Sequence, residues 1–186
     1  MKTPYTIENQ IFTNKAHDAA KRYVYPRVFR NSGITIRDTI LGTGKVETIL
    51  DGQLAIDRII NVPCETLNST IKLTVQERFR KPSHAKFRDI GITEWNNASG
   101  LEGELYKLHS NLFVYGYFND DTDIFTEIVV VNVPMLLMRI ATGTIKFTRT
   151  YFEDKYQSAI NVKFDDIKAT NCMIYSARNI GRNLMQ

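Results

Sequence analysis

Two apolar segments in the second half of the chain constrain its fold most strongly. FVYGYF (residues 113–118) and FTEIVVVNV (residues 125–133) are short runs rich in β-branched and aromatic residues, which is typical of buried strands. Pro134 is suited to the first turn of a helix over residues 135–141, where a missing N–H leaves no helical hydrogen bond unmade. These segments predict two buried strands and a helix.

The N-terminal part of the chain predicts a long helix. Apolar residues recur there at helical spacing, so we expect a helix over residues 6–24 that ends at the Tyr25-Pro26 step. Residues 32–44 are rich in Thr and Gly without a sustained period, which predicts an irregular connection.

Strands are predicted for the middle of the chain. Residues 45–50 and 53–62 flank Asp51-Gly52, a dipeptide typical of tight hairpin turns, so we expect a β-hairpin. Residues 71–80 (IKLTVQERFR) alternate apolar and polar side chains and predict a third strand, and residues 87–95 predict a fourth.

The segments between and after the apolar runs are also patterned. One face of a short helix would carry the leucines of the next segment, which are Leu101, Leu105, Leu108 and Leu112. Residues 144–152 predict a further strand. The expected order is therefore helix, three strands, helix and strand, followed by more β structure.

Composition excludes several classes of protein. With 186 residues, 43% hydrophobic and 24% charged, the chain suits one globular α/β domain. It has no long apolar run and no apolar N-terminal segment, so we expect a cytoplasmic protein without a membrane partner. The two cysteines, Cys64 and Cys172, suggest neither a disulfide framework nor a zinc site. The net charge of +4 slightly favours a polyanionic partner.

Common catalytic motifs are missing. The sequence contains no GxxxxGK[ST], GxSxG or HExxH, which argues against P-loop ATPases, hydrolases with a nucleophile elbow, and zincins.

Asp57 is the acidic residue with the most unusual surroundings. It lies in a segment, AIDRII, that otherwise has the pattern of a buried strand. A carboxylate there needs either an ion pair with an arginine or a metal ion. Hard Mg²⁺ prefers such oxygen ligands, and a bound cation can polarise a phosphodiester and activate water.

The element order, with AIDRII followed by the polar triplet of TVQERFR, resembles the PD-(D/E)XK nuclease superfamily over residues 6–118. This resemblance implies a restriction-endonuclease-like αβββαβ core, with a central mixed sheet flanked by helices. Residues 119–186 would then be a C-terminal β-rich extension. It also implies Mg²⁺-dependent cleavage of DNA, with Mn²⁺ as a possible substitute.

The third strand leaves two sets of site residues open. If Glu77 shares the face of Leu73 and Val75, Gln76 and Arg78 match the motif positions, with Gln for the acid and Arg for the Lys. In the other register Glu77 is the metal ligand. In both, Asp57 is a ligand, and the motif Lys is absent.

Two further residues are candidates for the same site. Lys107 on the expected leucine-patterned helix could replace the missing Lys, or it could be a solvated lysine paired with Glu104. Glu8 on the first helix could complete the metal site, as some superfamily members use an acidic residue there, although an exposed helical glutamate is the simpler interpretation.

A basic segment and a polar strand end could contact DNA. The residues that could bind successive phosphates are Arg78, Arg80, Lys81, His84, Lys86 and Arg88. Trp95 could stack on a base, and Asn96 or Asn97 could bind one. A solvated loop and a packed tryptophan are the simpler alternatives.

The leading hypothesis is a metal-dependent DNA endonuclease of the restriction, homing or junction type, active as a homodimer or higher homo-oligomer. The first alternative is a noncatalytic nucleic-acid-binding or assembly protein that keeps the nuclease-like fold. The second is an α/β domain without any role at nucleic acids.

Overall fold

The protein is an α/β structure built on two β-sheets. The computed structural model describes residues 7–30, 33–39, 45–96, 101–153 and 157–181. A mixed six-stranded sheet has the order β1-β2-β3-β6-β7-β10. Its strands are Thr35–Asp38 (β1), Arg58–Cys64 (β2), Ser69–Arg80 (β3), Leu112–Asn119 (β6), Ile124–Asn132 (β7) and Met173–Gly181 (β10). β3 and β6 are parallel and the other neighbours are antiparallel.

A smaller antiparallel sheet has the order β5-β4-β9-β8. Its strands are Asp89–Asn96 (β4), Leu101–Glu102 (β5), Thr148–Phe152 (β8) and Gln157–Lys163 (β9). The helical segments are Ile7–Ala19 (α1), Ala20–Val24 (η1), Tyr25–Val28 (α2), Lys45–Leu54 (α3), Glu65–Leu67 (η2), Pro82–Phe87 (η3), Glu104–Lys107 (α4), Val133–Ala141 (α5) and Phe164–Ala169 (α6).

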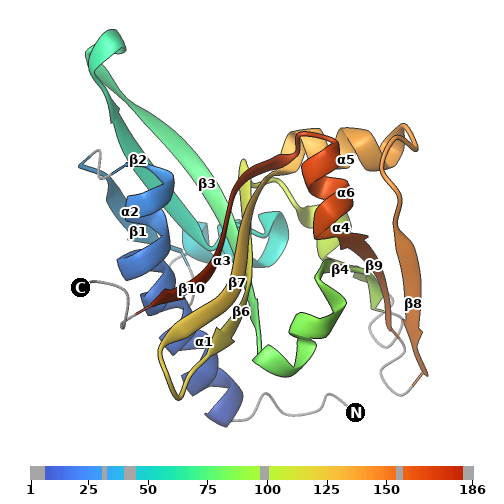
Figure 1. The fold of residues 1–186 in the computed structure, drawn as a ribbon. Coiled ribbons are helices and arrows are strands. Elements are labelled where there is room, and N and C mark those ends of the chain that lie inside the picture. Colours follow the sequence, from blue (N-terminus) through green and yellow to red (C-terminus); the bar gives the residue numbers. More distant parts are fainter. Residues whose placement is uncertain (1–6, 31–32, 40–44, 97–100, 154–156, 182–186) are drawn as a thin grey trace.

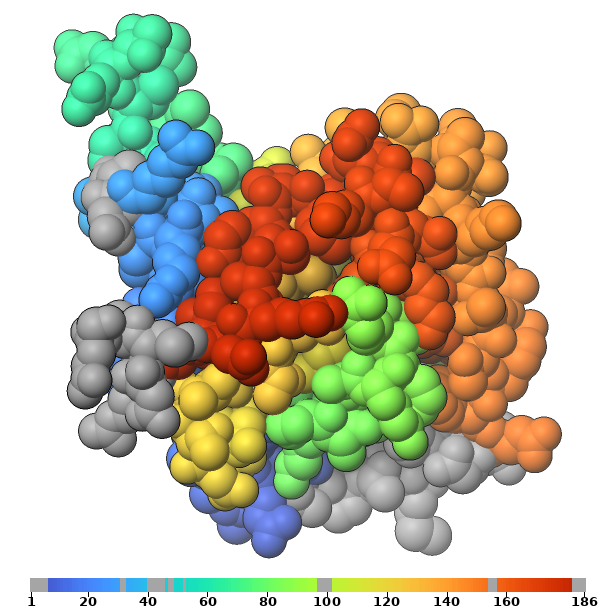
Figure 2. All heavy atoms as spheres, in the orientation of Figure 1, coloured from blue at the N-terminus to red at the C-terminus, as the bar shows by residue number. Residues whose placement is uncertain are grey.

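The six-stranded sheet separates two hydrophobic cores. On one face, alternate residues of the central strand β6, such as Val114 and Phe118, pack with the first helical segments. On the other face, Phe113, Tyr115 and Tyr117 pack with β4, β9, α5 and α6. Figure 1 shows α1 and α2 on one side of the large sheet and β8 and β9 on the other. The β2–β3 hairpin protrudes from this body (Figure 2).

Several strand and helix predictions are confirmed. The expected strands at 71–80, 87–95, 113–118 and 125–133 correspond to β3, β4, β6 and β7. The α/β class with a mixed sheet flanked by helices is confirmed as well. Pro134 lies in the first turn of α5, and Asn132 caps that helix by accepting the Met135 N–H at 2.9 Å.

The predicted end of the first helix was wrong. Instead of ending at Tyr25-Pro26, the helical path continues to Val28 through the π-helical segment η1. The wider turn, in which Tyr25 N–H donates to Ala20 O, accommodates a proline that an α-helix interior does not tolerate. Arg27 Nη1 donates to the Tyr23 carbonyl at 2.5 Å. The irregular connection predicted for 32–44 also contains β1.

The hairpin predicted around Asp51-Gly52 was wrong. Residues 45–54 form α3, in which Val46, Ile49 and Leu50 lie at helical spacing, with Val46 and Ile49 exposed. The actual hairpin joins β2 and β3 through η2, where Asn68 adopts the left-handed conformation with φ 45°.

The leucine-patterned helix was largely wrong. Only Glu104–Lys107 is helical, Leu101 belongs to β5, and Leu112 begins β6. Leu108 and Leu112 are nevertheless buried, so the leucine pattern indicated core residues although it did not indicate a helix. Of residues 144–152, the last five form β8.

The C-terminal third is part of both sheets. β7 and β10 complete the six-stranded sheet, and β9 pairs with β4. Within the residues that the structure describes, no helix is long and apolar enough to cross a bilayer.

Candidate functional site

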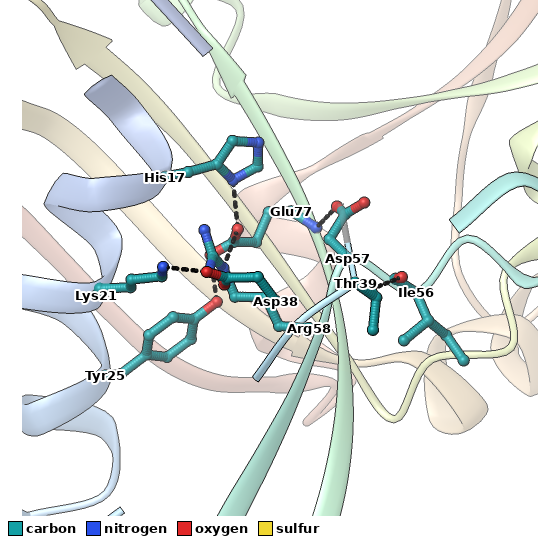
Figure 3. Close-up of polar contacts among 9 residues, drawn as sticks. All are labelled: His17, Lys21, Tyr25, Asp38, Thr39, Ile56, Asp57, Arg58 and Glu77. Carbon is teal, nitrogen blue, oxygen red and sulfur yellow. Dashed lines mark hydrogen bonds and ion pairs between the residues drawn. The ribbon is translucent and has the colours of Figure 1, made fainter. Parts of the chain in front are cut away.

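Glu77 lies on the helix-facing side of β3 and is completely buried. Its side chain is 0% exposed. Its carboxylate accepts a hydrogen bond from Arg58 Nε at 2.6 Å. It also contacts His17 Nδ1 and the Tyr25 hydroxyl. Figure 3 shows the Glu77 side chain directed toward the helix that carries His17 and Tyr25. The register in which Glu77 shares a face with Val75 and Phe79 is therefore the one found.

The surroundings of Glu77 favour its charged form. Burial by itself would raise the pKa of Glu77, but the hydrogen bond and charge of His17, together with Arg58 and Tyr25, lower the pKa below its ordinary value. Arg58 also contacts Asp38, whose carboxylate accepts Lys21 Nζ at 2.5 Å. This buried network joins the first helix to β1, β2 and β3.

Asp57 lies on the other side of the β3 backbone. Its Oδ2 accepts the Glu77 N–H at 2.6 Å, and its own N–H donates to Val75 O at 2.8 Å. The carboxylates of Asp57 and Glu77 thus point to opposite sides of the β3 backbone (Figure 3). Burial raises the pKa of Asp57 well above its ordinary value, and nearby Glu77, Asp51 and Glu104 raise it further, although the Glu77 N–H opposes this.

Asp51 on α3 lies close enough to Asp57 for the two carboxyl groups to shift each other's pKa. Burial raises the pKa of Asp51, while a hydrogen bond to Asp57 and the charge of His17 partly offset that rise. Two carboxyl groups can form a hydrogen bond only if they share a proton, and a cation between them would serve the same purpose. The raised pKa values of both groups favour a bound proton at this position.

A pocket of about 340 Å³ opens beside Asp51, on the face of β3 opposite Glu77. Side chains from both sheets, from α3 and from α4 meet there. Its lining residues are Asp51, Ala55, Gln76, Arg78, Thr93, Asn96, Glu102, Gly103, Glu104, Lys107 and Gln157.

Glu104 connects the two β3 side chains in this pocket. Gln76 Nε2 donates to Glu104 Oε1 at 3.1 Å, and Arg78 Nη2 lies 2.5 Å from Glu104 Oε2. Arg78 Nη1 also donates to Gly91 O at 3.1 Å. Among the described residues, Gln76 Oε1 is a buried acceptor without a hydrogen-bond partner. An orphaned acceptor of this kind is costly unless a donor or a cation joins it.

Gly103 allows Glu104 to reach the pocket. A Cβ at this position would lie 2.4 Å from Thr93 O and 2.6 Å from Glu94 O. The absence of a side chain therefore lets the backbone before α4 approach β4 closely, and Gly103 N–H donates to Glu94 O at 2.8 Å.

The predicted site residues are only partly brought together. Gln76, Arg78 and Lys107 line one pocket. Asp57 lies close to Asp51, which lines the same pocket. Glu77 lies on the opposite face of β3. Glu8 is exposed on α1, roughly 13 Å along the helix from His17 at about 1.5 Å per residue.

Most of the predicted DNA-binding cations lie away from this pocket. Lys81, His84 and Lys86 are exposed around η3. This segment precedes β4, whereas Asn96 at the other end of β4 lines the pocket, so roughly 25 Å separates them at about 3.3 Å per residue. Partial burial lowers the pKa of His84, and Arg80 and Lys86 lower it further, which disfavours a charged imidazole.

Arg80, Arg88 and Asn97 complete that set. Arg80 reaches toward Gly91, where a Cβ would lie 3.0 Å from its Nη2. Arg88 pairs with Glu127 at 3.2 Å and with Asp165 at 3.5 Å. Asn97 lies outside the described residues.

The pocket offers a donor set suited to a hard cation. Its carboxylate and amide oxygens are the ligand types that Mg²⁺ prefers, and Gln76 Oε1 is unpartnered within the described chain. In the same residues, no group of three or more His, Cys, Asp or Glu is arranged to hold a metal ion. A metal here would therefore need the amide oxygen as well as carboxylates.

Sequence patterns missed two acidic residues of the site. Asp51 was assigned to a hairpin turn, although the helical spacing of Val46, Ile49 and Leu50 was a signal for α3. Glu104 was considered only as a partner of Lys107, and its contacts with Gln76 and Arg78 depend on long-range packing.

Two other hollows have less chemical promise. One is lined by Arg88, Glu127 and Arg178, whose charges already pair with each other. The other lies between the segment that follows α5, which includes Ile145 and Phe147, and β9.

Comparison with protein-family models, with curated proteins and with solved structures finds no match for this chain. Its function must therefore be inferred from the pocket itself.

Replacement of Glu77 tests the buried network. Glu77→Gln removes the charge that faces Arg58 and His17, so the free energy of unfolding should fall by about 3 kcal/mol at pH 7. Because the folded-state pKa of Glu77 is lowered from 4.5, its contribution is present above that pH and is lost as pH falls through the folded value.

Urea unfolding of both proteins between pH 7 and pH 3 measures this difference, which should shrink below pH 4.5. Glu65→Gln, in the exposed turn of the hairpin, is the matched control and should change stability little. A constant difference at every pH would contradict the assignment.

Proposed function

We propose that this protein is a metal-dependent DNA endonuclease with a restriction-endonuclease-like core, acting in the cytoplasm. One observation carries the proposal: Gln76, Arg78 and Lys107, chosen from sequence for this chemistry, line a single pocket. They come from β3 and α4, which are separated in the sequence by two strands of the smaller sheet, β4 and β5. The mixed sheet with parallel β3 and β6 is compatible with such a core.

The acidic side of the pocket would hold Mg²⁺, or Mn²⁺ in its place. Asp57 and Asp51 supply carboxylate oxygens, and Gln76 supplies Oε1. When bound there, the cation supplies charge that polarises the scissile phosphate and lowers the pKa of an attacking water. Burial is the main cause of the raised pKa of Asp57. A bound cation would offset this cost by stabilising the ionised carboxylate.

Electrostatics also favour a cation at this site. Among the described lining residues, the carboxylates of Asp51, Glu102 and Glu104 outnumber the cations of Arg78 and Lys107. Phosphate would be repelled from such a pocket, and a divalent ion would reverse the balance.

Arg78 and Lys107 would bind the phosphate. Arg78 carries a planar guanidinium, which can hold two phosphate oxygens at once. Its guanidinium is held by Glu104, which keeps it oriented toward the pocket. Lys107 lies on the same turn of helix as Glu104 and supplies the amine that strand β3 lacks.

A homodimer or higher homo-oligomer would suit this activity, because one site cuts one strand and two-fold symmetry supplies the second. Restriction, homing and junction substrates all fit the proposal.

The alternative is a noncatalytic nucleic-acid-binding protein with the same fold. It is favoured by the absence, among the described residues, of three clustered His, Cys, Asp or Glu side chains. In that case the Arg78–Glu104 pair would be structural, and DNA would bind without being cut.

Cleavage of supercoiled and cruciform plasmids with Mg²⁺ or Mn²⁺ tests the proposal. We expect nicking or linearisation that EDTA abolishes. Asp57→Asn should reduce the rate at least about a hundredfold, because it removes ligand charge while keeping an acceptor for the Glu77 N–H. Glu8→Gln, an exposed acidic residue of α1, is the control and should cleave normally. Intact DNA with every metal, despite retained binding, would favour the noncatalytic alternative.

Lys107 should contribute chiefly to the rate of cleavage. Lys107→Ala removes a cation from the pocket, so kcat should fall by about a hundredfold or more with little change in secondary structure. Single-turnover cleavage at saturating protein isolates this step. Lys86→Ala, an exposed lysine of η3, removes the same charge elsewhere. Equal effects of the two substitutions would mean that Lys107 acts only through general charge.

A further inference from the structure

An exposed aromatic pair lies beside the proposed active site. Trp95 of β4 is 39% exposed and Tyr106 of α4 is 46% exposed. Their ring centroids are 5.6 Å apart, with an angle of 52° between the planes. Neither ring is among the described residues that form the two hydrophobic cores. Part of the apolar ring surface of this pair therefore remains exposed to water after folding.

The pair is fixed next to the pocket by the backbone. Trp95 is directly opposite Glu102 in the β4–β5 ladder, so the two side chains share a face of the smaller sheet, and Glu102 lines the pocket. Tyr106 belongs to the same short helix as Glu104 and Lys107, which also line the pocket. The ladder continues into the close approach at Gly103, which holds α4 against β4.

We infer that Trp95 and Tyr106 form a stacking platform for an unpaired base whose phosphate lies in the adjacent pocket. This inference rests on the proposed function and narrows its substrate to DNA that is single-stranded or contains unpaired nucleotides. In a duplex both faces of a base are covered by its neighbours, so an aromatic platform can be used only when a base is unstacked.

With a divalent ion bound in the pocket, charge supports nucleic acid as the occupant of the platform. Arg78 and Lys107 supply phosphate-binding groups in the pocket next to it. Aromatic rings for the base and cations for the phosphate together match the two parts of one nucleotide.

The sequence allows a direct measurement, because Trp95 is the only tryptophan of the chain. Its fluorescence is recorded with Ca²⁺ in place of Mg²⁺ while a single-stranded oligothymidylate is added. We expect saturable quenching and much weaker binding of a blunt duplex of equal length. Equal quenching and equal affinity for both DNAs would overturn the inference.

Substitutions separate stacking from general binding. Tyr106→Ala should weaken single-strand binding roughly tenfold or more, whereas Tyr106→Phe should retain it. Tyr151→Ala, on the exposed strand β8, is the matched control and should bind normally. Trp95→Ala removes the only tryptophan, so its affinity is measured from the fluorescence anisotropy of a labelled oligonucleotide. Unchanged affinity in Tyr106→Ala and Trp95→Ala, with native circular dichroism, would contradict the platform.

The outcome is separable from that of the nuclease proposal. Selective single-strand binding without cleavage would contradict the nuclease and leave the platform intact. Metal-dependent cleavage of duplex and unpaired DNA at equal rates would contradict the platform alone.

Discussion

The buried carboxylate of Glu77 is the interaction on which the rest of the structure depends. Arg58 from β2, His17 from α1 and Tyr25 from α2 surround it, so one ionised group joins the helical layer to the large sheet. A carboxylate in this position is tolerated only with such partners. Because side chains alternate along a strand, fixing Glu77 on this face directs Gln76 and Arg78 to the other.

The pocket is a product of how the two sheets meet. β3 presents Gln76 and Arg78, while α4 brings Glu104 and Lys107 from the connection between β4 and β6. Asp57 reaches the same region because its backbone is held by β3, with its carboxylate on the Glu77 N–H. The buried network thus holds the strand in register, and the half-buried opposite face of that strand lines the pocket.

Local patterns predicted much of this arrangement and missed its long-range parts. The alternation of Leu73 and Val75 correctly implied the face of Glu77, and the apolar runs gave β6 and β7. The dipeptide Asp51-Gly52 led to the wrong prediction of a hairpin. A turn dipeptide can also lie inside a helix, as it does in α3. The role of Glu104 depends on contacts between segments that no local pattern encodes. The functional assignment itself stays a prediction.

Binding of Mn²⁺ to the metal-free protein tests the central claim most directly. In an NMR titration of isotope-labelled protein, paramagnetic broadening should be saturable and greatest at the Gln76 side-chain amide and at Glu104. Asp57→Asn should weaken it strongly, since that carboxylate would be a ligand. Broadening centred elsewhere, such as at the turn of Asp120, Asp121 and Asp123, or the absence of saturable binding would contradict a metal site in this pocket.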